Sequence, residues 1–273
     1  MKNKQHRPIK IIFPSTITTF AMIFGYLAII VATTSDNYTR AGYLVMFALI
    51  MDGLDGKVAR ITNTASEFGI QYDSLSDLVA FGIAPAVIYY MFYLHEQVTD
   101  QVYYLLPIMY LVCGAIRLAR FNVTASIYGK AFFQGLPIPA AAFMTVSLPM
   151  FFVWSQDYAP FKEFGWDVYL TKENMFQASI IVAIVLSISM ISTMRFDTPV
   201  NFWLRKFKSK PLNYLIVVAF LSLWPLVSFP FFAVAFSYYY LCFMYGRALY
   251  YKVRKHHEEP VAEEPEEVNP TAS

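Results

Sequence analysis

The sequence predicts an all-α membrane protein: a polytopic helix bundle of about eight transmembrane helices with both termini in the cytoplasm. Three observations lead to this fold class: the composition, a series of apolar stretches and the placement of positive charge. The chain of 273 residues is 57% hydrophobic and 15% charged, whereas soluble domains have about 45–50% apolar and about 25% charged residues. The composition therefore excludes a soluble protein, and the length suits one compact bundle.

The apolar stretches give the helices in order. A helix that crosses a bilayer needs roughly 20 predominantly apolar residues. Candidate spans lie at 12–33, 41–61, 73–95, 102–121, 136–155, 174–194, 211–227 and 229–250. Only the segment between Trp224 and Pro230, with Pro225 inside it, separates the last two spans. A single kinked re-entrant pair is the alternative there.

Positive charge predicts the orientation. With the N-terminus inside, 18 of the 21 Lys and Arg residues fall in cytoplasmic segments, as the positive-inside rule requires. We expect the membrane domain to cover 1–255 and an acidic, proline-rich tail at 256–273 to be disordered. Six of the 19 acidic residues lie in that tail, so the net charge of +2 understates how basic the membrane domain is. A basic membrane domain suits contact with anionic membrane lipids.

Four aspartates near the cytoplasmic ends of the second and third spans form the candidate site. Asp52 and Asp55 are three residues apart on one helix, and Asp73 and Asp77 are four apart on the next. Each pair therefore shares one helix face, and two adjacent antiparallel helices can point all four carboxylates at each other. Such a group at membrane depth needs a compensating cation. Oxygen ligands favour Mg²⁺ or Mn²⁺, and a two-metal centre would clamp a diphosphate.

Two glycines lie on the same helix faces as the carboxylates. Gly56 follows Asp55 directly, and Gly69 is one turn before Asp73. The missing side chains leave room for a ligand or a neighbouring backbone. Packing of helices through small residues is the alternative, and the sequence leaves both interpretations open.

The spacing fills the pattern D-x2-D-G-x2-A-R-x8-G-x3-D-x3-D at every position, with Asp52, Asp55, Gly56, Ala59, Arg60, Gly69, Asp73 and Asp77. This pattern resembles the signature of the CDP-alcohol phosphatidyltransferase family. The resemblance implies that the four aspartates hold a two-metal centre and that Asp77 also takes the proton of the acceptor hydroxyl. It further implies a CDP-diacylglycerol donor whose CDP end contacts Gly56, Ala59 and Gly69. Arg60 would contact the diphosphate of the donor or brace the acidic cluster, and the resemblance leaves both roles open.

The start of the first span departs from the family pattern. Many members carry Pro-Asn-x-x-Thr there, whereas this chain has Pro14-Ser15-Thr16-Ile17-Thr18. The expected asparagine contact with the nucleotide is absent, and Thr18 remains as a donor-binding candidate.

Stretches 68–82, 117–122 and 135–140 resemble the phosphatidylserine synthase branch of the family. The branch implies L-serine as the acceptor, and the family resemblance implies a homodimer. A serine carboxylate needs a fixed cation, and arginine pairs with carboxylates in bidentate fashion. The candidate acceptor contacts are Arg117, Arg120, Asn122 and Lys130. The same charges are also explained as ordinary positive-inside residues, or as contacts to glycerol 3-phosphate or inositol phosphate.

A cation transporter is the alternative from another class, because intramembrane aspartates often mark ion pathways. Against transport, both aspartate pairs crowd one face of the membrane, and no acid recurs at mid-depth in later spans. A scaffold without catalysis would leave the carboxylates uncompensated. We expect no nucleic-acid partner. Compact size without a targeting peptide fits a prokaryotic inner membrane, with the site facing the cytoplasm.

Overall fold

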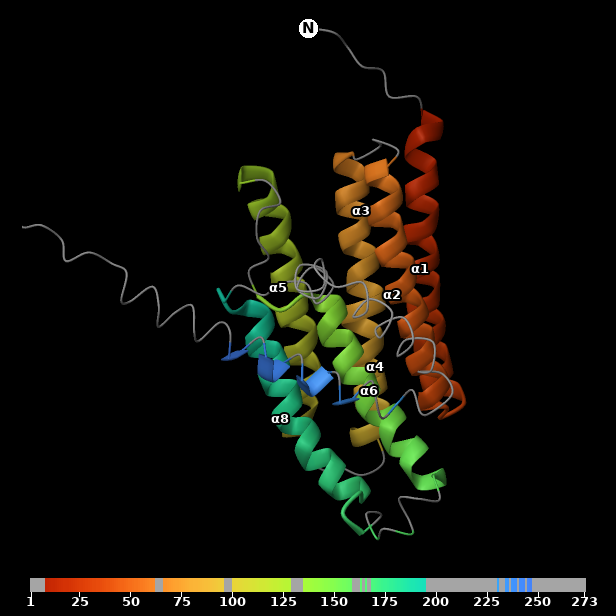
Figure 1. The fold of residues 1–273 in the computed structure, drawn as a ribbon, viewed down its shortest axis with the longest axis vertical. Helices are drawn as coiled ribbons and strands as arrows, with labels where there is room; N and C mark the ends of the chain where they lie inside the picture. The colour runs from red at the N-terminus through yellow and green to blue at the C-terminus, as the bar shows by residue number, and fades with distance from the viewer. Residues whose placement is uncertain are drawn as a thin grey trace, which may run out of the picture.

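The computed structural model describes residues 8–61, 66–95, 100–128, 135–158, 163, 165 and 168–194, and scattered residues between 230 and 246. Within these residues every regular element is a helix and no strand occurs. The all-α prediction is therefore confirmed for the described part of the chain. The helices run roughly alongside one another, with α1 and α2 at one edge of the bundle and α8 at the other (Figure 1).

The first two helices form a tight antiparallel hairpin. Helix α1 (Pro8–Thr34) and helix α2 (Tyr38–Ile61) make the most extensive contact among the described elements. Small buried side chains on both helices, such as Ala28, Ala32 and Ala41, let the backbones approach closely. The turn is built by Asp36, which has a positive φ of 50°. Asn37 then caps α2 by accepting a hydrogen bond from the Arg40 N–H at 2.9 Å.

The third span is one continuous helix that contains two π-helical turns. It comprises α3 (Glu67–Asp77), the π-helical turn η1 (Leu78–Ile83), α4 (Ala84–Tyr89) and a second π-helical turn η2 (Tyr90–Leu94). The Ser66 hydroxyl caps its start by accepting a hydrogen bond from the Gly69 N–H at 3.0 Å. Because η1 follows Asp77 directly, the change of register lies beside the candidate site.

The remaining described helices complete the bundle. A short 3₁₀ turn, η3 (Gln101–Tyr104), leads into α5 (Leu105–Tyr128), and α6 (Ile138–Asp157) and α8 (Lys172–Ile191) follow. The core lies between these helices and the hairpin, and includes the fully buried Ala80, Phe81 and Ile138. Gly25 brings α1 against η1, since a Cβ at Gly25 would lie 2.5 Å from the Ala80 Cα. Helix α1 therefore packs directly against the π turn.

The predicted spans between 12–33 and 174–194 each coincide with a described helix. Five segments are long and apolar enough to cross a membrane: Ser15–Thr34, Glu67–Leu94, Gln101–Val123, Ile138–Asp157 and Lys172–Ile191. Helix α2 is a continuous helix in the expected place, but its charged end keeps it out of that group. Span 211–227 and most of 229–250 lie outside the described residues, as does the tail at 256–273. The total of eight helices and the cytoplasmic termini therefore stay predictions.

Candidate active site

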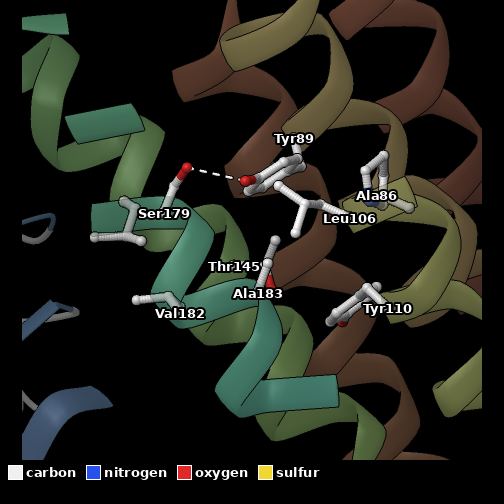
Figure 2. A pocket seen from close by; sticks show the side chains of 10 residues that line it. Ala86, Tyr89, Leu106, Tyr110, Thr145, Ser179, Val182 and Ala183 are labelled. Atoms are coloured by element: carbon white, nitrogen blue, oxygen red, sulfur yellow. Dashed lines mark hydrogen bonds between the residues drawn. The ribbon is translucent and has the colours of Figure 1, made fainter. Parts of the chain in front are cut away.

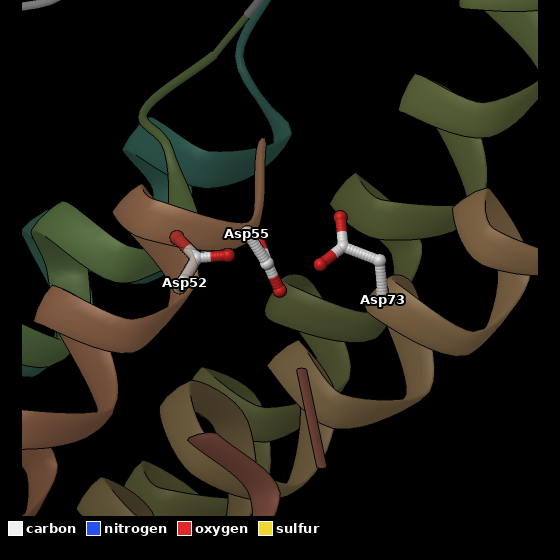
Figure 3. Close-up of side chains that lie close together, drawn as sticks. All are labelled: Asp52, Asp55 and Asp73. Carbon is white, nitrogen blue, oxygen red and sulfur yellow. The ribbon is translucent and has the colours of Figure 1, made fainter. Parts of the chain in front are cut away.

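Three aspartates converge where α2 faces α3. One carboxylate oxygen from each of Asp52, Asp55 and Asp73 lies within 4.8 Å of the other two. Figure 3 shows the Asp52 and Asp55 carboxylates extending from α2 toward the Asp73 carboxylate of α3. Asp55 is buried, and the other two are half-buried. The structure thus brings three of the four predicted aspartates into one group of oxygen ligands.

Asp77 adjoins this group without being a member of it. It is the last residue of α3, is only 9% exposed, and lies in hydrogen-bond contact with the Asp52 side chain. The sequence analysis expects Asp77 to be both a metal ligand and the group that takes the acceptor proton. In the structure Asp77 is buried beside the three clustered carboxylates, and its hydrogen-bond contact with Asp52 suits a group that exchanges a proton with a substrate.

Helix α1 braces both of the helices that carry the carboxylates. The Thr18 hydroxyl donates to Asp55 Oδ2 at 2.6 Å, and the Ser76 hydroxyl donates to the Thr18 carbonyl oxygen at 2.9 Å. The Thr19 and Tyr72 hydroxyls are hydrogen-bonded at 2.8 Å. The sequence predicts that Thr18 contacts the CDP donor. Its hydroxyl orients a candidate metal ligand in the structure, and the contact with the donor stays a prediction. Ser76, Thr19 and Tyr72 were missed, because they carry no signal in the spacing of the aspartates.

Arg117 of α5 is the cation beside the carboxylates. It is 5% exposed, and its guanidinium interacts electrostatically with Asp77 and Asp52. The guanidinium also lies 5.3 Å above the centre of the Phe121 ring. Among the described residues, Arg117 Nε has no hydrogen-bond partner. Since buried polar groups are normally paired, this donor is available to a ligand at the carboxylate group.

Two other predicted acceptor contacts have partners within the bundle. Arg120 donates to the carbonyl oxygens at the end of α8, at 3.1 Å for Met190, 2.7 Å for Ile191 and 2.9 Å for Ser192. The Asn122 amide donates to Gln71 Oε1 at 3.2 Å and to the Ser74 hydroxyl at 3.0 Å, which joins α5 to α3. Both residues therefore hold helices together. Only Arg117 of the described candidates lies with the carboxylates.

The remaining candidates are only partly visible. Lys130 lies outside the described residues. The backbone of Ala59 and Arg60 belongs to α2, but their side chains also lie outside the described part of the structure. The predicted roles of these three residues stay predictions.

The two glycines have different surroundings. A Cβ at Gly56 would meet nothing within 4 Å in the described structure, so the space next to Asp55 is open. A Cβ at Gly69 would lie 3.2 Å from Ser66 Oγ, so this glycine accommodates the helix cap. Gly56 therefore fits the approach of a ligand better than helix packing.

The clustered groups fit a hard divalent cation. Carboxylate oxygens are the ligands that Mg²⁺ and Mn²⁺ prefer, and Asp52, Asp55 and Asp73 supply three of them from two helices. The Thr18 hydroxyl donates a hydrogen bond to one of these ligands, Asp55, as outer-shell partners of metal sites commonly do. The three carboxylate ligands, the short distances between their oxygens and the hydrogen bond from Thr18 all agree with a metal site.

Comparison with known proteins decides the family. The family described as CDP-alcohol phosphatidyltransferase matches residues 11–189, a range that contains all four aspartates. The chain belongs to the CDP-alcohol phosphatidyltransferase family. In this family, a metal site, a CDP-linked donor and an alcohol acceptor are expected at the carboxylate group.

Curated relatives come from several branches of life. A protein of Helicobacter pylori is 36% identical over 212 residues, which cover 78% of this chain and 81% of the relative. One from Methanocaldococcus jannaschii is 39% identical over 130 residues, 48% of this chain and 56% of the relative. One from Saccharomyces cerevisiae is 40% identical over 116 residues, 40% of this chain and 41% of the relative. All three are named CDP-diacylglycerol–serine O-phosphatidyltransferase.

Proposed function

We propose that this CDP-alcohol phosphatidyltransferase transfers the phosphatidyl group of CDP-diacylglycerol to the hydroxyl of L-serine, giving phosphatidylserine and CMP. The observation that carries the proposal is the buried Arg117 beside a group of three carboxylates. The shared name of the Helicobacter, Methanocaldococcus and Saccharomyces relatives supports serine as the acceptor.

The reaction breaks the phosphoanhydride bond between the two phosphates of CDP-diacylglycerol and forms a phosphate ester bond to serine. The serine hydroxyl oxygen attacks the lipid-side phosphorus, the bond from that phosphorus to the bridging oxygen breaks, and CMP leaves with the electron pair. Asp77 accepts the hydroxyl proton, because its carboxylate is enclosed and lies against Asp52 at the edge of the site. The proton is then released to water or to the departing CMP phosphate.

Asp52, Asp55 and Asp73 would hold a divalent cation, Mg²⁺ or Mn²⁺, and Asp77 would complete a two-metal centre. When bound, such a centre neutralises the negative charge of the diphosphate and of the departing CMP. The protein's own part is to keep the ligands oriented, which the Thr18 hydroxyl does for Asp55. The open space at Gly56 admits the CDP end of the donor.

Arg117 would select the acceptor. A serine molecule carries a carboxylate, and a guanidinium binds that group through two parallel hydrogen bonds. The Nε of Arg117 has no partner among the described residues, so the acceptor carboxylate would pair a donor that is otherwise buried and unsatisfied. The hydroxyl of the same serine would then reach toward Asp77, which interacts with Arg117 electrostatically.

The membrane arrangement belongs to the same proposal. We expect eight spans in a prokaryotic inner membrane. We also expect cytoplasmic termini and a site that opens to the cytoplasm, because this orientation places 18 of the 21 basic residues on the cytoplasmic side. Diacylglycerol chains would then stay in the bilayer while the CDP headgroup enters the site. The homodimer expected from the family resemblance is part of the proposal.

The test is CMP release by purified protein with CDP-diacylglycerol and Mn²⁺ or Mg²⁺, with L-serine, glycerol 3-phosphate or inositol phosphate offered in turn. Release with serine alone, reduced about 10²- to 10⁴-fold in Asp77→Asn, is the expected result. Asp36→Asn is the matched control, because Asp36 lies in the turn at the far end of α2. Release with another alcohol alone would contradict the serine assignment, and no release with any alcohol would contradict the transferase.

A further inference from the structure

The helix that carries Asp77 widens immediately after it. Over Leu78–Ile83 the third span has π register, and the Ala84 N–H bonds to the Val79 carbonyl five residues back. Pro85 supplies the physical reason. A proline inside a helix has no N–H and its ring clashes with the carbonyl four residues earlier, which here belongs to Phe81. A π turn relieves this clash by accommodating one more residue than an α turn.

The Phe81 carbonyl is satisfied from another helix. Phe81 is fully buried, and Pro85 cannot donate to it. The Tyr110 hydroxyl of α5 donates to this oxygen at 2.9 Å, and Tyr110 itself is only 2% exposed. The wide turn is therefore fixed by a buried hydrogen bond between two consecutive helices, from residues 29 apart in the sequence.

The register of this turn decides where Asp77 points. Each residue of an α-helix advances the chain by about 100° around the axis. One extra residue in the turn therefore rotates Asp77 by about the same angle relative to the buried segment that begins at Ala84. In the observed register the Asp77 side chain is in hydrogen-bond contact with the Asp52 side chain of α2. A return to α register would turn Asp77 away from Asp52.

We infer that Tyr110 is a positioning residue for the reaction: by holding the Phe81 carbonyl it keeps the π turn that aims Asp77 at Asp52. The inference rests on the proposed function, in which Asp77 accepts the proton of the acceptor. Tyr110 acts through the backbone of the third span and contacts neither of these two aspartates.

A matched control lies in the same cavity. Tyr89 and Tyr110 both line a cavity between the third span, α5, α6 and α8 (Figure 2). The Tyr89 hydroxyl is hydrogen-bonded to the Ser179 hydroxyl at 3.0 Å, also in a buried setting. Tyr89→Phe therefore removes a hydrogen bond of similar kind, at a point three turns of helix beyond Asp77.

The experiment compares Tyr110→Phe, Tyr89→Phe and the natural protein in kcat and KM for CMP release and in the midpoint of thermal unfolding. We expect kcat to fall about tenfold in Tyr110→Phe, because small displacements of reacting groups are costly. Both KM values should stay within about twofold of the natural protein, since substrate contacts are unchanged. Tyr89→Phe should keep its kcat. Unchanged kcat in Tyr110→Phe, or equal losses in both variants, would overturn the inference.

Two further measurements keep the test decisive. If Tyr110→Phe does not fold, Pro85→Ala replaces it, since alanine gives the Phe81 carbonyl a backbone donor and allows α register; natural kcat in Pro85→Ala overturns the inference. If the natural protein releases no CMP, the proposed function fails separately. In that case the role of Tyr110 is tested by the Mn²⁺ affinity, measured by electron paramagnetic resonance. This affinity should be weaker in Tyr110→Phe than in Tyr89→Phe. Equal affinity overturns the inference.

Discussion

Replacing Thr18 by valine removes one hydroxyl and preserves the shape of the side chain. That hydroxyl donates to Asp55 Oδ2 at 2.6 Å, and Asp55 is 6% exposed. A hydrogen bond to a charged group contributes about 1.5–3 kcal/mol. Since about 1.4 kcal/mol corresponds to a factor of ten in an equilibrium constant, Thr18→Val should weaken metal binding roughly ten- to hundredfold. Loss of outer-shell partners in other metal sites has an effect of the same size.

The assay is the Mn²⁺ concentration that gives half-maximal CMP release at saturating CDP-diacylglycerol and serine. Thr33→Val is the matched control, because within the described part of the chain the Thr33 hydroxyl of the same helix bonds to the carbonyls of Ile29 and Ile30 alone, at 2.9 and 3.1 Å. We expect the half-maximal concentration to rise in Thr18→Val and to stay unchanged in Thr33→Val. An equal Mn²⁺ requirement in the two variants would refute the view that α1 orients a metal ligand.

Two further predictions separate substrate contacts from packing. Arg117→Lys keeps the positive charge but loses the pair of parallel hydrogen bonds that a guanidinium makes. The KM for serine should therefore rise about tenfold, with little change in the KM for CDP-diacylglycerol. Arg120→Lys should instead lower the unfolding temperature, because Arg120 holds the end of α8. A raised KM for serine in Arg120→Lys would contradict this division. Gly56→Leu should abolish CMP release without changing the unfolding temperature, because its side chain would enter open space beside Asp55. Gly53 also lies in open space, but on another side of the helix from the carboxylates, so Gly53→Leu should retain activity. Equal loss of CMP release in the two variants would contradict the view that the donor occupies the space at Gly56.

The sequence predicted the helices because their causes are local. Runs of about 20 apolar residues require a helix in a membrane, and each predicted span from 12–33 to 174–194 overlaps a described helix along most of its length. The π turns were not predictable in this way. Pro85 marks the place where the helix must deviate, but the deviation is stabilised by Tyr110, 29 residues beyond Phe81. Hydrogen-bond register inside a span depends on such distant partners.

The residues of the candidate site differ in the same way: those with local causes were predictable from the sequence, and those with distant partners were not. The aspartates were found because periodicity within one helix fixes which side chains share a face. The partners of Arg120 and Asn122 could not be found, because they lie on α8 and α3, 71 and 51 residues away for Ile191 and Gln71. An arginine near the end of a span has the same sequence signature whether it binds a substrate or the end of a neighbouring helix. Only the packing of α5 separates Arg117 from Arg120.

The consecutive threonines of α1 have a consequence for how the first helix is regarded. Thr18 contacts the helix that carries Asp55, and Thr19 contacts Tyr72 on the helix that carries Asp73. An N-terminal apolar helix is often treated as an exchangeable anchor that only delivers a protein to the membrane. Here the same segment sets the distance between two other helices. A foreign anchor of equal hydrophobicity would still insert the chain, but it would leave the distance between the two aspartate-bearing helices unset.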